Sequence, residues 1–312
     1  MAISARTAGP LTAPRRRLLT KEAVEGYACI LPWLVGFLSF VAGPMVAAFA
    51  ISFTDWSMLT PPRWVGVGNY QRMLADPLFY AVLYNTAFIS FLSVPLQLTL
   101  ALVIALGLNE KLRGVALYRT LFYLPSQMPI VASALLWLWV LNPEFGLANA
   151  LLGLFGLPPL RWLFDPATVK PSIVLVTLWG GIGTPLIIFL AGLQGVPDSL
   201  YEAAEIDGAG ALARFRHITL PMLSPIIFFN LIIGIIASFQ AYFTLVFITT
   251  QGGPANTSLI FILYIYFKAF RDFDMGYAST LAWTLFLIVL VLTAINFLLA
   301  RFWVHYEGAE RA

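Results

Sequence analysis

A charged, glycine-containing segment, residues 202–221, separates two long apolar stretches of the chain. Ser199 precedes Glu202 by three positions, the spacing at which each side chain can satisfy an unpaired backbone N–H of the other. We therefore expect a helix to begin here, and Gly208 can adopt the left-handed conformation that ends one. Gly210 then leaves the backbone free to start a second helix.

The second half of this segment is basic. Thr219 with Pro221 is a plausible cap and first turn for the apolar helix that follows. Two short helices joined by a bend, the first acidic and the second carrying cations, would suit electrostatic docking of another protein. A well-capped connecting loop is the alternative interpretation. The cationic residues are Arg214, Arg216 and His217.

Several kinds of chemistry are excluded. The apolar stretches carry no ionisable side chain away from their ends, whereas proton-driven carriers usually need a relay at membrane depth. No glycine directly precedes any lysine, so the glycine–lysine loop that cradles nucleotide phosphates is absent. His217 and His305 have no second ligand nearby, and Cys29 is the single cysteine, which leaves no histidine or cysteine metal site. The paired acids or nucleophile with its base that a membrane-embedded enzyme needs are also missing.

Composition predicts a membrane protein. Of 312 residues, 60% are hydrophobic and 11% charged, which exceeds the apolar share and falls below the charged share of soluble domains. About 20 apolar residues cross a bilayer as a helix, so we expect an all-α integral membrane fold with six transmembrane helices. The run at 259–267 is too short to span and is expected to pack outside the membrane against the bundle. The six expected spans are 27–53, 79–108, 118–141, 171–193, 220–249 and 277–302.

Basic residues predict the orientation of these spans. Twelve of the 18 Lys and Arg residues fall in the N-terminal tail, the second-to-third connection, the 202–221 segment and the C-terminus. The positive-inside rule therefore places both termini and the 202–221 segment in the cytoplasm. We expect tails at 1–26 and 303–312, a membrane domain at 27–302, and a cytoplasmic loop at about 197–220. Arg15 and Arg16 could suggest an export signal, but the long following span is better interpreted as a retained anchor.

The spacing of the charged segment resembles a known signature. It contains E-A-A, three residues, G, nine residues and I-x-L-P, similar to the loop of the permease subunits of binding-protein-dependent ABC importers. Asp207, Phe215 and Pro225 resemble the form of this loop in the sugar-type branch. The residues that carry the spacing are Glu202, Ala203, Ala204, Gly208, Ile218, Leu220 and Pro221.

The resemblance extends along nearly the whole chain, toward the oligosaccharide branch and the maltose-permease-like first subunit. Relative to the maltose prototype, the chain has only six expected spans and a short first external loop. The matching positions are Pro32, Trp33, Gly36, Pro44, 52–56, 68–70, 252–255 and 273–278.

The resemblance implies a type I importer permease fold in a bacterial inner membrane and an assembly of several chains. The partners would be a homologous second permease, two copies of an ABC ATPase and an extracytoplasmic solute-binding protein, with no nucleic acid. ATP and Mg would sit on the ATPase subunits, so this chain would hold no cofactor and no catalytic residue. Glu202 and Gly208 would form the coupling helix that docks into the ATPase, Ala203 and Ala204 would pack at this contact, and Asp207 would flank it.

A path for a neutral sugar needs hydroxyl and amide groups plus aromatic faces near the membrane midplane, without fixed charge. Three segments supply these groups, and they match the regions where maltose-type permeases line their sugar site. Packing of helices through small residues is the alternative for each segment. The candidate path residues are Ser126, Gln127, Thr177, Gly181, Thr184, Ser238, Phe239, Gln240 and Tyr242, with Gln240 and Tyr242 expected first.

Another class of transporter is also compatible with these helices. A secondary carrier or a channel would work alone, and the purified chain in liposomes would then show flux without ATP or partners. The sequence does not identify which sugar is carried.

Overall fold

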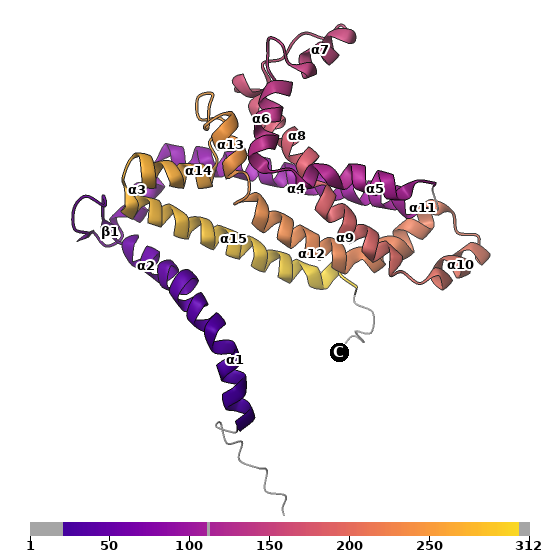
Figure 1. Cartoon of the computed structure of the whole chain (residues 1–312), viewed down its shortest axis with the longest axis horizontal. Helices are drawn as coiled ribbons and strands as arrows, with labels where there is room; N and C mark the ends of the chain where they lie inside the picture. Colours follow the sequence, from indigo (N-terminus) through magenta and orange to yellow (C-terminus); the bar gives the residue numbers. More distant parts are fainter. Residues whose placement is uncertain (1–20, 111–112, 306–312) are drawn as a thin grey trace, which may run out of the picture. The chain divides into compact units, whose positions relative to one another are not determined.

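The computed structural model describes residues 21–110 and 113–305, mostly as helices (Figure 1). The chain divides into two units, Met1–Ala50 and Ile51–Ala312. The first unit holds α1 (Lys21–Phe37), a π-helical turn (Leu38–Ala42) and nearly all of α2 (Gly43–Ile51). Together these form a continuous apolar helix over Ala23–Ile51, long enough to cross a membrane.

The second unit contains all the other elements, which Figure 1 follows in colour. A hairpin of two very short strands precedes the helices of this unit. Strand β1 (Thr54–Asp55) pairs antiparallel with β2 (Arg63–Trp64), and Thr54 lies opposite Trp64. The helices are α3 (Gly68–Ala75), α4 (Pro77–Asn109), α5 (Val115–Tyr123), α6 (Ile130–Val140), α7 (Leu147–Leu154), α8 (Val169–Gly181), α9 (Gly183–Gln194), α10 (Asp198–Ile206), α11 (Ala211–Arg214), α12 (Leu220–Ser238), α13 (Phe243–Thr249), α14 (Phe261–Tyr266) and α15 (Met275–Trp303). Tighter 3₁₀ turns occupy Leu124–Gln127 and Trp162–Phe164, and π-helical turns occupy Phe215–Thr219 and Phe267–Arg271.

Four helices of the described chain are long and apolar enough to cross a membrane, and two bent pairs raise this number to as many as six. The single helices cover Ala23–Ile51, Pro77–Asn109, Ala211–Ser238 and Met275–Trp303. Apolar helices therefore lie at all six expected spans. The chain has six spans if each bent pair crosses the membrane as one span.

The expected third and fourth spans are not straight. Val115–Gln127 and Ile130–Val140 meet at 97°, and Pro125 and Pro129 flank this break. Val169–Gly181 and Gly183–Gln194 meet at 48° in a glycine-rich stretch that ends at Pro185. Proline removes a backbone donor and clashes with the preceding turn, and glycine carries the lowest helix propensity after proline, so both breaks occur where the backbone ladder is weakest.

The expected fifth span is wrong at both ends. Its helix starts at Ala211 and continues through a π-helical turn into α12, so Thr219 does not cap a new helix but lies inside a continuous one. The helix then stops at Ser238, and a turn at 239–242 separates it from α13. Thr219 is buried in helical conformation, and its hydroxyl pairs with the Tyr201 side chain and not with a backbone N–H of the following turn.

The core of the second unit surrounds α4. This helix packs against α8, α9 and α12, and its side chains Val82, Ile89 and Ala101 are fully buried. Asp76 caps its start, with its carboxylate 2.9 Å from the backbone nitrogen of Leu78. A long buried helix thus provides the wall against which the other helices are placed.

The segment at 259–267 packs against this core as expected. It forms α14, in which Phe261 and Leu263 are fully buried, and it contacts α4, α13 and α15. Tyr264 donates a hydrogen bond to Asp76 at 2.5 Å, and Tyr277 of α15 donates to the same carboxylate at 2.8 Å. These bonds join α4, α14 and α15 at one end of the unit.

Candidate functional site

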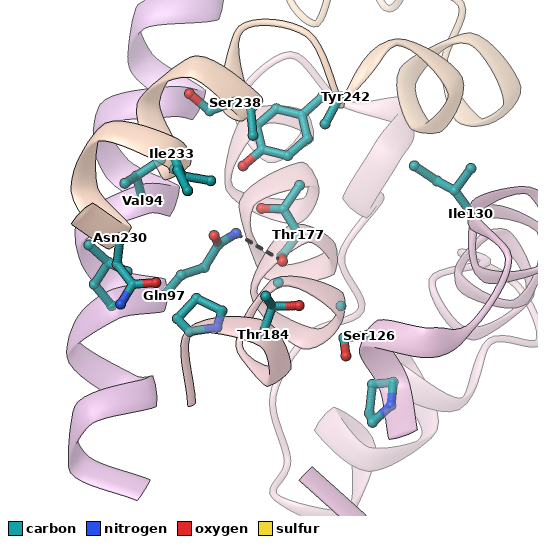
Figure 2. Close-up of a pocket in the computed structure, with 18 of the residues that line it drawn as sticks. Val94, Gln97, Ser126, Ile130, Thr177, Thr184, Asn230, Ile233, Ser238 and Tyr242 are labelled. Atoms are coloured by element: carbon teal, nitrogen blue, oxygen red, sulfur yellow. Dashed lines mark hydrogen bonds between the residues drawn. The ribbon is translucent and has the colours of Figure 1, made fainter. Parts of the chain in front are cut away.

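A cavity of about 540 Å³ lies among α4, α8, α9, α12 and the segments that flank them (Figure 2). Its walls are mostly apolar, and no Asp, Glu, Lys, Arg or His lines it. The lining residues are Val94, Gln97, Leu98, Pro125, Ser126, Met128, Ile130, Ser133, Val176, Thr177, Gly180, Gly181, Thr184, Pro185, Ile188, Phe229, Asn230, Ile233, Gly234, Ala237, Ser238, Ala241, Tyr242 and Leu245.

The amide of Gln97 crosses from α4 toward α8. Its Nε2 donates to the carbonyl oxygen of Thr177 at 3.0 Å, the contact drawn as a dashed line in Figure 2. A Cβ atom at Gly181 would lie 2.5 Å from this same Nε2, so only glycine leaves room for the amide. The exposed remainder of the amide gives the cavity a donor and an acceptor on an otherwise apolar wall.

Tyr242 stands at the turn that ends α12. Its hydroxyl lies 2.9 Å from the Oγ of Ser93 on α4, and in Figure 2 it points toward Gln97 and Thr177. Ser238, one turn earlier, donates to the carbonyl of Ile235 at 2.8 Å. Because the helical backbone hydrogen bonds stop at Ser238, the Tyr242 ring can point into the cavity.

The opposite wall comes from the bend before α6. The Oγ of Ser126 donates to the carbonyl of Tyr123 at 2.7 Å within the 3₁₀ turn. Gly183 lets α9 approach this turn, because a Cβ there would lie 2.5 Å from the Ser126 Oγ. Thr184 follows directly and lines the cavity between the two walls (Figure 2).

The structure brings together six of the nine expected path residues: Ser126, Thr177, Gly181, Thr184, Ser238 and Tyr242. The other three do not line the cavity. Gln127 and Gln240 are exposed elsewhere, and Phe239 is buried with 2% of its surface exposed. The role of all nine in transport stays a prediction.

Sequence reasoning missed two amides of this cavity. Gln97 and Asn230 each lie within an expected apolar span, and Asn230 donates to the carbonyl of Ile226 at 3.1 Å. An amide inside an apolar span was the available signal, because buried polar groups are kept only where they find partners.

The cavity suits a neutral, hydroxyl-rich ligand. Hydroxyl and amide groups can exchange hydrogen bonds with it, the Tyr242 ring offers an aromatic face, and no fixed charge must be neutralised. Among the described residues no group of three or more His, Cys, Asp or Glu side chains could hold a metal ion.

The second candidate site is the docking segment, residues 198–214. α10 starts within one residue of the expected position, but Ser199 and Glu202 form no capping box, because Pro197 occupies the cap position. Gly208 takes the expected left-handed conformation, with φ +75°, and the backbone N–H of Ala209 closes the turn onto the carbonyl of Ala204 at 2.8 Å. Glu202, Ala203, Asp207 and Gly208 are exposed, and Ala204 is half-buried.

Two contacts join α10 to the long helix Ala211–Ser238. The Tyr201 hydroxyl lies 2.9 Å from the Oγ1 of Thr219, and Glu205 lies 3.8 Å from Arg214. The first contact involves a buried threonine and therefore orients α10 more firmly than the second, which is a solvent-exposed ion pair.

The docking segment also presents apolar side chains that the sequence reading overlooked. Ile206 is 87% exposed at the end of α10, and Leu212 is 79% exposed on α11. They flank the Gly208 bend, and an apolar residue inside a charged segment is the sequence signal that could have identified each of them. The segment thus combines acidic and apolar contact groups.

Comparisons with known proteins agree with this fold. Residues 97–305 match the family described as binding-protein-dependent transport system inner membrane component. The chain is 40% identical over 300 residues to the probable ABC transporter permease protein YesP of Bacillus subtilis, covering 95% of this chain and 96% of that one. It is 35% identical to the trehalose/maltose transport system permease protein MalF of Thermococcus litoralis, covering 92% and 97%.

A solved structure has the same fold. The crystal structure of a bacterial ABC transporter involved in import of the acidic polysaccharide alginate contains a chain that superposes with a TM-score of 0.79 at 24% identity, covering 90% of this chain and 96% of that one. The family match and the two relatives confirm the expected resemblance to importer permeases. This chain belongs to the family of inner membrane components of binding-protein-dependent transport systems.

Proposed function

We propose that this chain is one of two permease subunits enclosing the path of an ATP-driven importer for a sugar or oligosaccharide. The uncharged cavity carries this proposal, because hydroxyl and amide groups on apolar walls suit a neutral saccharide. Its relatives support the substrate class, since one is named a trehalose/maltose permease and another, 34% identical, a lactose permease of Rhizobium radiobacter.

The proposed topology has six crossings with both termini in the cytoplasm of a bacterial cell. The distribution of basic residues supports this orientation, and the two bent helix pairs each count as one crossing. The docking segment then lies in the cytoplasm, and the loop at 250–260 lies outside.

Coupling would use the docking segment and the long helix that follows it. Glu202, Ile206 and Gly208 would contact one of two ATPase subunits, which bind ATP and Mg, while this chain binds neither. A continuous helix runs from Ala211 to Ser238 and lines the cavity at Asn230 and Ser238. Its 28 residues extend about 40 Å, so a displacement at the ATPase would move a cavity wall.

The cavity would then open alternately to either side of the membrane. A homologous second permease would complete its walls, and an extracytoplasmic binding protein would deliver the sugar, as the family description implies. Fixed polar groups in a cavity lined by two bent helix pairs fit this type of alternating access.

Purification and transport test the proposal together. We expect the chain to co-purify in mild detergent with a second permease and an ATPase, and the reconstituted complex to show ATP-dependent saccharide uptake. Glu202→Lys should abolish uptake while membrane insertion and the copy number of the second permease remain unchanged. Saccharide flux through the purified chain alone, without ATP, would establish a secondary carrier or channel instead.

A further inference from the structure

The helix α7 carries an apolar surface that neither the cavity nor the docking segment explains. Its members recur at one-turn spacing along one helix face and continue into the residues after it. Leu154 and Phe155 are each 80% exposed, and the other three members are about half exposed. This surface, here called the α7 face, consists of Leu147, Leu151, Leu154, Phe155 and Leu157.

Polar contacts on the opposite side of α7 hold the α7 face outward. The amide of Asn149 donates to the carbonyls of Pro143 and Leu160 at 3.0 and 2.9 Å. It also accepts from the Leu160 N–H at 3.1 Å and from the Trp162 indole at 2.8 Å. All four hydrogen-bonding positions of this amide are therefore used to close residues 143–162 around α7.

A specific turn also fixes the C-terminal end of α7. Gly156 takes a left-handed conformation with φ +68°, and the Leu157 N–H donates to the carbonyl of Leu152 at 3.0 Å. This bond closes a helix-ending motif that glycine favours. The exposed side chains thus belong to an ordered module, and their exposure is a property of its fold.

The surroundings of the α7 face indicate a lipid neighbour. Residues 143–164 contain only two charged side chains, Glu144 and Arg161. Directly before this module, α6 exposes Leu135, Leu136 and Trp139 on a helix of the bent third span. α7 therefore contacts a helix that itself exposes apolar side chains and belongs to a candidate membrane span.

The composition of the α7 face favours a bilayer. Its five members are all Leu or Phe, whereas the rim of a protein interface is polar. A short helix with one apolar face can sit in a bilayer, where that face lies roughly 5–10 Å into the boundary between headgroups and acyl chains.

We propose that the α7 face is an interfacial anchor that inserts into the bilayer surface. α7 would then hold the start of α8 and the end of α6, both of which line the cavity through other residues, at a fixed depth. The proposal needs only the membrane location of the family and not the identity of the substrate.

Site-directed spin labelling in the assembled transporter, in nanodiscs, tests this. Cys29→Ser removes the single cysteine of this chain, and partner cysteines are replaced. Leu151→Cys and Leu154→Cys place labels on the α7 face. Gly153→Cys is the matched control, because it is exposed on the other side of the same helix and a Cβ there meets nothing within 4 Å.

We expect labels at 151 and 154 to collide readily with dissolved oxygen and poorly with a water-soluble nickel chelate. At both positions, the ratio of the oxygen collision rate to the chelate collision rate should exceed the ratio at position 153 severalfold. Equal access of the chelate to all three labels would place α7 in water and overturn the proposal. Protection of 151 and 154 from both reagents would reveal a covering protein and overturn it as well.

Discussion

The cavity and the docking segment differ in the chemistry of their side chains. In the cavity, Gln97, Thr177 and Tyr242 are uncharged and already paired with groups of the chain itself. In the docking segment, Glu202 and Ile206 are exposed, and the Glu202 carboxylate accepts no hydrogen bond from the described residues. A site that must release its ligand benefits from self-satisfied polar groups, whereas a site that must grip a partner keeps its contact groups available.

One element connects the two regions. The continuous helix Ala211–Ser238 begins beside the Gly208 bend and ends at the cavity wall. Experiments should therefore distinguish substitutions in the two regions. Substitutions at the bend should uncouple ATP hydrolysis from transport. Substitutions in the cavity should alter substrate recognition and leave the coupling intact.

The largest effect is expected at the bend. Gly208→Pro replaces a residue at φ +75° by one restricted to about −65° and removes the N–H that donates to Glu205 at 3.0 Å. A penalty of about 3 kcal/mol or more would displace α10 and abolish uptake, measured in inverted vesicles or proteoliposomes.

Gly210→Ser is the matched control for this bend. Gly210 lies two residues away with φ −70°, it is the N-cap of α11, and a Cβ there meets nothing within 4 Å. Serine is a favoured N-cap residue, so uptake should stay near the wild-type rate. Equal loss of uptake in both variants would show that the left-handed turn is not what matters.

The next largest effect is expected in the cavity. Gly181→Ala places a Cβ where the Gln97 amide now lies, 2.5 Å from Nε2, and so displaces the amide from Thr177. Loss of this bond with some overpacking costs roughly 1–2 kcal/mol, and the KM for the saccharide should rise about tenfold.

Gly180→Ala provides the comparison for Gly181→Ala. Both glycines line the cavity on the same helix, but a Cβ at Gly180 meets nothing within 4 Å. ATPase activity stimulated by the binding protein and its substrate should persist in both variants at saturating substrate. A KM unchanged at Gly181→Ala would remove Gln97 from substrate recognition.

A smaller effect is expected at Tyr242. Tyr242→Phe keeps the ring and removes the hydroxyl that lies 2.9 Å from Ser93. A neutral hydrogen bond contributes about 1 kcal/mol, so the KM or the preference between saccharides should shift about fivefold. Gln240→Ala should have less effect, because Gln240 does not line the cavity. A larger effect of Gln240→Ala in uptake assays would reverse this ranking.

The sequence predicted helix type and the Gly208 turn correctly because both depend on local properties. Apolar runs of about 20 residues and a glycine at a helix end need no tertiary information to be recognised. The Thr219 cap failed for the converse reason. Its hydroxyl pairs with Tyr201, 18 residues away, and the residue lies in a helix that local signals do not predict to begin before Thr219.

The walls of the cavity were only partly predictable. The turn at 239–242 interrupts the helical period, so the facing of Phe239 and Gln240 cannot be extrapolated from Ser238. Gln97 depends on a glycine 84 positions later, Gly181, that leaves room for it. Such pairs become visible only when the helices are placed side by side.

The smallest effect on transport is expected away from both regions, at Asp76. Burial of this carboxyl raises its pKa, but hydrogen bonds from Tyr264 and Tyr277 outweigh burial and hold the pKa below its usual range. A depressed pKa stabilises the fold above the ordinary value of about 3.9 and loses this contribution as pH falls through the native value.

Tyr264→Phe removes one of these donors while preserving the buried ring. Because a hydrogen bond to a charged group contributes about 1.5–3 kcal/mol, the melting temperature in detergent should fall at neutral pH, whereas the KM of the folded transporter should change less than twofold. The difference in melting temperature from wild type should shrink below about pH 4, as Asp76 becomes protonated in both proteins. A change in KM as large as that of Tyr242→Phe would mean that the end of the bundle, and not the cavity alone, determines recognition, and the separation between the two regions would fail.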